Sequence, residues 1–142
     1  MKLYEFLADF KGADPEEALE ILMEFGDKLP ALSDGRVVEG TPPQCRIREC
    51  QTPVYLWVDV VDGRMRLEAV VAEESPTVRG FVGLLVEGLS GASPADVAKL
   101  PEDFLPLLGL SATLGMTRQK GFRGIVTRIK REAAQGNAKN PG

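Results

Sequence analysis

The most reactive side chains in this chain belong to two cysteines, Cys45 and Cys50. The chain has no histidine, so Ser-His-Asp and Cys-His pairs and imidazole metal ligands are excluded. A cysteine thiolate can attack sulfur and then pass the outer sulfur of a persulfide to another thiol by the same exchange reaction. Sulfur transfer is therefore open to these residues, and a buried, inert thiol is the alternative that the residues alone leave open.

The two cysteines differ in their predicted surroundings. Cys50 lies where an irregular stretch meets a strand pattern, in ECQTPVYLWV. A loop tip beside a strand can present a thiol while the strand fixes its position. Pro53 keeps the residues after Cys50 at a sheet edge or outside regular pairing. Two thiols without histidine fall short of the four ligands of a zinc site, so we expect no metal, and we interpret Cys45 as a spectator.

A β-hairpin is predicted directly after Cys50. Asp62-Gly63 is a two-residue turn pattern, because glycine accepts the positive φ that such a turn needs. Residues 64–72 return antiparallel, and residues 45–48 form a predicted third short strand. Apolar residues alternate with other residues before the turn, as in a strand with one buried face: Val54, Leu56, Val58 and Val60.

The other segments are predicted to be helical. Capping residues, prolines at helix starts and apolar residues at helical spacing predict five helices: from Asp14, from Ser75 to about Leu89, from Ser93, over 101–108, and from Thr117. Gly80 and Gly83 in the central helix indicate close packing against a neighbour. The chain is therefore predicted to form one α+β domain over residues 1–135, with about three antiparallel strands covered by helices on one face, and a disordered tail at 136–142.

Composition narrows the class of protein. With 142 residues and 44% hydrophobic content, the chain suffices for one compact core. It has no apolar run as long as a membrane span, no signal-peptide pattern at its start and no phosphate-binding glycine motif. We therefore expect a cytoplasmic protein that does not associate with a membrane.

Charge is distributed unevenly along the chain. Residues 1–114 hold ten Lys/Arg against twenty Asp/Glu, and residues 115–142 hold seven against one. The first predicted helix carries an acidic face: Glu16, Glu20, Glu24 and Asp27. A basic helix can bind nucleic acid, but the aromatic content is only 6% and the remainder is acidic. We therefore interpret the basic C-terminal segment as a solvated helix face and expect no nucleic acid partner.

The segment ECQTPVYLWV resembles the active-site segment of the SufE family, which typically reads Gly-Cys-Gln-Ser-Gln-Val-Trp. Three residues match it directly: Cys50, Gln51 and Val54. Glu49 stands in place of the usual glycine and Pro53 in place of the second glutamine. Glu49 also disfavours a thiolate at Cys50, and Arg46 and Arg48 are the nearby cations that can compensate for its charge.

The resemblance extends over nearly the whole chain. LMEFGDKLPAL, SPTVRGFVGLLVEGLSGASPADV and LGLSATLGMTRQKGFRGIVTRIK are similar to the early, central and C-terminal blocks of the family. In the last block, Leu114, Arg118 and Gly121 match the family pattern, whereas Thr113 stands at the usual histidine position. The resemblance thus implies an α+β fold like that shared by SufE and the iron–sulfur scaffold IscU.

The resemblance also implies a function. SufE proteins are not enzymes and carry no cofactor. They accept persulfide sulfur from a SufS-type cysteine desulfurase, stimulate its turnover, and pass the sulfur to a SufBCD-type scaffold. For this chain, the resemblance implies that Cys50 is the sulfur acceptor. It also implies that three residues bind the partner: Gln51, Glu74 and Arg118. For Arg118 an exposed arginine at a helix start is the alternative, and for Glu74 the alternative is complementation of the helix dipole.

Two other functions stay open at this point. An iron–sulfur scaffold of the IscU type needs about three thiolates and a further ligand, which two cysteines without histidine do not supply. A protein-interaction module without sulfur chemistry would leave both thiols incidental. The sequence does not distinguish a monomer from a homodimer, a buried from an exposed Cys50, or one dedicated desulfurase from another.

The charged helices generate a prediction about partner encounter. We expect the acidic first helix or the basic last helix to steer the desulfurase, so association should slow as salt screens these charges. Stopped-flow association rates at low and moderate ionic strength measure this effect. An unchanged rate would show that neither charged face matters for encounter.

Overall fold

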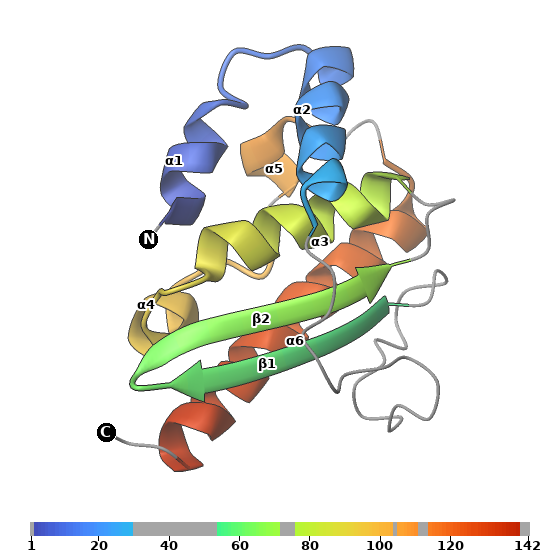
Figure 1. Ribbon diagram of the computed structural model, residues 1–142. Helices are drawn as coiled ribbons and strands as arrows, with labels where there is room; N and C mark the ends of the chain where they lie inside the picture. Colours follow the sequence, from blue (N-terminus) through green and yellow to red (C-terminus); the bar gives the residue numbers. More distant parts are fainter. Residues whose placement is uncertain (1, 30–53, 72–75, 104, 111–113, 140–142) are drawn as a thin grey trace.

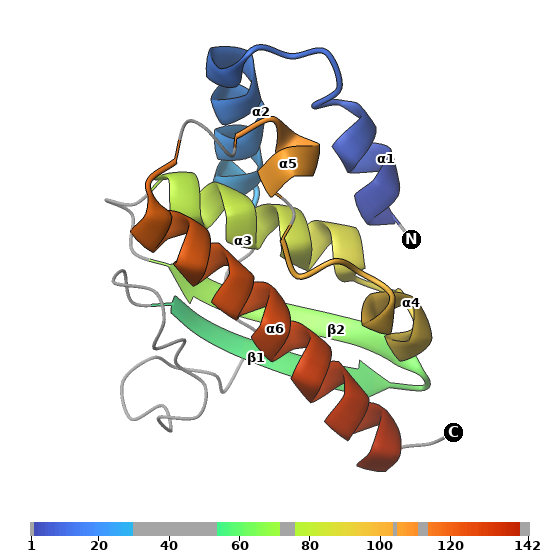
Figure 2. The ribbon, with the colours of Figure 1, turned by 180° about the vertical axis from the view of Figure 1, so that it is seen from behind.

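The computed structural model describes residues 2–29, 54–71, 76–103, 105–110 and 114–139. In this part of the chain, two helices precede a β-hairpin and four follow it: α1 Lys2–Ala8, α2 Pro15–Asp27, β1 Val54–Val61, β2 Arg64–Val71, α3 Pro76–Leu89, α4 Pro94–Ala98, α5 Leu105–Leu108 and α6 Met116–Lys139. Figure 1 and Figure 2 show α3 and α6 on one face of the hairpin, with α1, α2 and α5 beyond α3. The predicted α+β class is confirmed.

The β-hairpin follows the predicted pattern. Its turn residues Asp62 and Gly63 have φ of 53° and 74°, as a two-residue turn of this kind requires. The antiparallel register pairs Val54 with Val71 at the open end. One face is buried in the core: Val54, Leu56, Val60, Met65, Leu67, Ala69 and Val71. The predicted third strand, residues 45–48, lies outside the described residues.

Capping hydrogen bonds confirm the predicted starts of two helices. The carboxylate of Asp14 accepts a hydrogen bond of 2.9 Å from the backbone N–H of Glu17 at the start of α2. The hydroxyl of Ser93 accepts one of 3.2 Å from the N–H of Asp96 at the start of α4. Helix α3 spans Pro76–Leu89, the bounds that the sequence predicts.

Helices α1 and α5 differ from the prediction. The sequence patterns predict no helix before Asp14, yet α1 forms two turns with Leu3 fully buried. A helix this short depends on tertiary packing, and Leu3 lies so close to Gly88 that a Cβ on this glycine would come within 2.9 Å of the leucine side chain. Helix α5 covers only the last four residues of the predicted 101–108.

Helix α6 is longer than predicted at both ends. It begins at Met116, so Thr117 lies in its first turn rather than at the cap. It continues to Lys139, four residues past the predicted end at Gln135. The extra turn still meets the sheet, because a Cβ on Gly136 would lie 2.8 Å from a methyl carbon of Val60.

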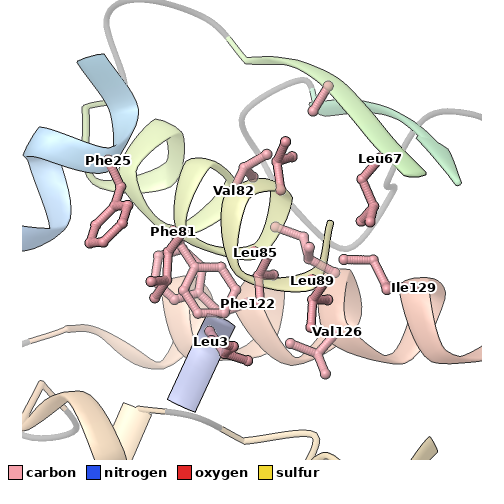
Figure 3. Packing of buried hydrophobic residues seen from close by; sticks show 14 of the residues in the cluster. Leu3, Phe25, Leu67, Phe81, Val82, Leu85, Leu89, Phe122, Val126 and Ile129 are labelled. Carbon is pink, nitrogen blue, oxygen red and sulfur yellow. The ribbon is translucent and has the colours of Figure 1, made fainter. Parts of the chain in front are cut away.

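Helix α3 is the centre of the core and is almost completely covered. Figure 3 shows its apolar side chains between α6 and the hairpin, with Phe81 facing Phe122 of α6. These two rings stack with centroids 4.1 Å apart and an interplanar angle of 6°. The ring contact places the first half of α3 beside the first half of α6.

The contact between α2 and α3 depends on two glycines of α3. A Cβ on Gly80 would lie 2.3 Å from the carbonyl oxygen of Leu22, and one on Gly83 would lie 2.3 Å from that of Phe25. Both distances are far below van der Waals contact with backbone atoms. The close packing that the sequence predicts at these positions is confirmed, and its partner is a helix rather than the sheet.

This contact predicts a cost for any side chain at Gly83. Gly83→Ala should lower the free energy of unfolding by about 1–3 kcal/mol, because α2 must move away from α3 to accommodate the methyl group. Urea denaturation measures the change. Gly115→Ala is the matched control, because a Cβ there meets nothing within 4 Å, and its effect should stay within about 0.5 kcal/mol. Equal stability of the two variants would contradict the proposed crowding.

Candidate functional site

The predicted site residues fall in two groups. Cys50, Gln51 and Glu74, together with Cys45, lie outside the described residues, whereas Arg118 is described. The elements that flank the first group are also described. In the sequence, Val54 at the start of β1 follows Cys50 by four positions, and Pro76 at the start of α3 follows Glu74 by two.

The flanking elements meet at one end of the molecule. The start of β1 is paired with the end of β2 through Val54 and Val71. The starts of α3 and α6 are joined by the stacked rings of Phe81 and Phe122. In Figure 1 this end of the molecule is at the right and in Figure 2 at the left. Both views place the start of β1, the end of β2 and the starts of α3 and α6 there. We call it the junction end, defined by Val54, Val71, Pro76 and Met116.

Arg118 is the one predicted site residue with a described position. It lies half-buried in the first turn of α6, at the junction end. The side-chain amide of its neighbour Gln119 donates a hydrogen bond of 2.8 Å to the carbonyl of Leu114, which ties the start of α6 to the preceding residues. Within the described part of the chain, no carboxylate forms an ion pair with Arg118.

The basic residues farther along α6 serve the fold instead. Arg128 pairs with Glu132 at 3.2 Å, and the ammonium of Lys130 donates to the carbonyl of Leu100. The guanidinium of Arg123 lies 3.9 Å from a carboxylate oxygen of Asp103. Two basic side chains of this helix, those of Arg123 and Lys130, thus hold the segment between α4 and α6 against α6. Only the remaining exposed basic side chains face solvent.

The predicted acidic face of α2 is exposed at all four positions, which are Glu16, Glu20, Glu24 and Asp27. At the start of the helix the pKa of Glu17 is raised, first by a hydrogen bond with Asp14 and then by the negative charges around it. The start of α2 is therefore a site of concentrated negative charge, which disfavours the ionised form of Glu17.

Arg79 is a residue of the junction end that the sequence analysis does not single out. Its guanidinium donates to the carbonyl of Val71 at 3.0 Å and to the carbonyl of Gly26 at 3.2 Å. The sequence shows only one signal for it, a charged residue in the first turn of a mostly apolar helix. Its partners are 8 and 53 residues away in the sequence, so no local pattern could have predicted them.

The residues that the structure describes contain neither a cluster of metal ligands nor a membrane-spanning helix. Among them, no group of three or more potential ligand side chains lies close enough to hold a metal ion. No helix in the same ranges is long and apolar enough to cross a membrane.

Comparison with known proteins identifies the class that this fold belongs to. The family model of SufE, described as an Fe-S metabolism associated domain, matches residues 4–133. The chain therefore belongs to the SufE family, as the sequence motifs predict. Membership of this family supports a sulfur-transfer role tied to iron–sulfur metabolism, and it implies interaction with a cysteine desulfurase.

Individual relatives agree with this assignment. The chain is 38% identical over 130 residues to an uncharacterized SufE-like protein of Mycobacterium tuberculosis, covering 91% of this chain and 89% of that protein. It is 30% identical over 104 residues to the cysteine desulfuration protein SufE of Plasmodium falciparum, covering 68% of this chain and 42% of that protein. The solution structure of a hypothetical protein from Thermus thermophilus has a TM-score of 0.81 and 34% identity, and the match covers 96% of both chains.

Proposed function

We propose that this chain is a cytoplasmic sulfur acceptor for a SufS-type cysteine desulfurase. It takes persulfide sulfur on Cys50, stimulates desulfurase turnover by clearing the enzyme's persulfide, and passes the sulfur to a SufBCD-type scaffold. It acts as an accessory protein rather than an enzyme and uses no cofactor. Cys45 takes no part in the transfer.

One observation carries the proposal. In a chain of the SufE family, the start of β1, which follows Cys50 in the sequence, and the end of β2 and start of α3, which flank Glu74, lie at the junction end, where α6 begins with Arg118 in its first turn. The acceptor thiol is joined by a short stretch of chain to Val54, which is fully buried and paired in the hairpin. A short connection to a rigid element limits where a reactive group can go and so supports directed transfer.

The transfer step is a thiol–disulfide-type exchange. The Cys50 thiolate attacks the outer sulfur of the desulfurase persulfide, a new S–S bond forms, and the donor S–S bond breaks. The donor cysteine leaves as a thiolate, so electrons balance without an oxidant. The long helices α3 and α6 both start at the junction end, and the partial positive charge of helix N-termini favours thiolate and persulfide anions there.

The rival functions lack such support. An iron–sulfur scaffold needs more thiolate or imidazole ligands than two cysteines and no histidine provide. An interaction module without sulfur chemistry would not require the Cys50-Gln51 pair that matches the family motif. Reconstitution with iron and sulfide separates these functions, because charge-transfer absorption would appear only for a scaffold.

The central test is which cysteine accepts sulfur. Cys50→Ser should abolish stimulation of the desulfurase and leave the fold nearly intact, because serine is close to cysteine in size. Cys45→Ser should keep most of the stimulation. Mass spectrometry after incubation with desulfurase and cysteine should locate one added sulfur atom on Cys50 in the wild type and in Cys45→Ser.

Two results would contradict this assignment. Added sulfur on Cys45 with full activity of Cys50→Ser would make Cys45 the acceptor. Equal loss of stimulation in the two variants would indicate a relay through both cysteines.

Arg118 is proposed as a partner-binding residue, with Gln51 and Glu74 as its companions. Arg118→Ala should raise the concentration of this protein that half-saturates the desulfurase by about tenfold, since a hydrogen bond to a charged group contributes about 1.5–3 kcal/mol. Lys120→Ala is the matched control, because Lys120 is an exposed cation two positions farther along α6. The proposal for Arg118 fails if both alanine variants half-saturate the desulfurase at the wild-type concentration.

A further inference from the structure

Arg79 joins three elements at the junction end, its own helix and two that its side chain contacts. Arg79 itself belongs to the first turn of α3, Val71 is the last residue of β2, and Gly26 lies in the last turn of α2. One guanidinium nitrogen donates to the Val71 carbonyl at 3.0 Å and the other to the Gly26 carbonyl at 3.2 Å. The planar guanidinium thus fixes the distance between a strand end and a helix end.

These contacts concern the two stretches of sequence that carry the proposed acceptor and its companions. The stretch with Cys50 runs from the end of α2, near Gly26, to Val54, which pairs with Val71. The stretch with Glu74 runs from Val71 to the start of α3, where Arg79 lies. Of the four ends of these stretches, Val71 accepts a hydrogen bond from Arg79, and Val54 pairs with Val71. The end of α2 contains the other acceptor, Gly26, and the first turn of α3 contains Arg79 itself.

The chemistry at the end of α2 explains why an arginine suits this position. The last carbonyls of a helix lack intrahelical partners and carry partial negative charge. Helix α2 has no basic side chain in its last turn, so Arg79 supplies the favourable charge from α3. Gly26 permits the close approach, because a Cβ on it would lie 3.2 Å from the Cβ of Arg79 and 3.0 Å from the nitrogen of Gly80.

We propose that Arg79 is a positioning residue for sulfur transfer, because its guanidinium holds together the chain ends between which Cys50 and Glu74 lie. The proposal rests on the proposed function of Cys50. Arg79 acts through the chain ends and not by contact with sulfur. Its loss therefore lowers the maximal rate of persulfide formation more than it changes the concentration that half-saturates the desulfurase.

The test compares two arginines, one bonded near each end of the hairpin. Arg79→Gln removes the paired donation at the junction end. Arg64→Gln is the matched control, because the Arg64 guanidinium also donates to a backbone carbonyl, that of Gly91 at 3.0 Å, but at the turn end of the hairpin. Each variant loses hydrogen bonds from a guanidinium to backbone carbonyls. Only Arg79→Gln loses them next to the proposed site.

Two measurements are made on each variant. The first is the rate of persulfide formation on Cys50 with desulfurase and cysteine, where Arg79→Gln should be slower by on the order of tenfold and Arg64→Gln unchanged. The second is the rate of tryptic cleavage after Arg36, Arg46 and Arg48, which lie between α2 and β1 in the sequence. Cleavage should be faster in Arg79→Gln and unchanged in Arg64→Gln.

Each outcome decides the proposal. Equal transfer rates and equal cleavage in the two variants would overturn it. Faster cleavage in Arg79→Gln with an unchanged transfer rate would also overturn it, because Arg79 would then serve the fold alone. If the wild type gains no sulfur on Cys50, the proposed function fails, whereas the cleavage comparison still tests whether Arg79 holds the chain ends.

A conservative variant covers the case in which Arg79→Gln does not fold. Arg79→Lys keeps the charge at the end of α2 but lacks the rigid pair of donors. Its transfer rate should fall between those of Arg79→Gln and the wild type, at a melting temperature near that of Arg64→Gln. A wild-type transfer rate in Arg79→Lys would show that charge alone suffices and would overturn the positioning role of the paired hydrogen bonds.

Discussion

The contact between α2 and α3 leaves no room for a Cβ at Gly80 or Gly83. A Cβ at either position would lie 2.3 Å from a carbonyl oxygen of α2. Because the two helix backbones approach this closely, the last turn of α2 comes within hydrogen-bonding distance of Arg79. The same approach buries Leu22 and Phe25 against the core helix. The position of the end of α2, which precedes Cys50 in the sequence, thus depends on the absence of side chains at Gly80 and Gly83.

The opposite side of α3 provides the second half of the framework. The stacked rings of Phe81 and Phe122 bind α6 to α3, and Gly136 keeps the far end of α6 against Val60 of the hairpin. A rigid α3–α6–hairpin unit therefore places the starts of both long helices at one end. Sulfur transfer between proteins needs such a unit, because a reactive group must be offered from a defined direction.

The sequence predicted those elements whose signals are local. The Asp14 cap, the Asp62-Gly63 turn and the bounds of α3 follow from neighbouring residues, and the structure confirms them. The family motif likewise indicated the class of protein, which the family match confirms. Helix α1 and the last turn of α6 were missed because tertiary contacts stabilise them. The two hydrogen bonds of Arg79 were missed because their acceptors are distant in sequence, and Cys50 stays a prediction from its motif.

The distance in sequence between Leu22 and Gly80 has a consequence for how such proteins can diverge. Their contact closes a chain loop that contains the hairpin and the whole Cys50 stretch. The entropy of closing a loop rises only logarithmically with its length, by about 0.6 kcal/mol for each doubling. Insertions or deletions between α2 and β1 therefore change the free energy of folding little. The stretch between α2 and β1 can therefore change in length during evolution while the helical framework stays the same.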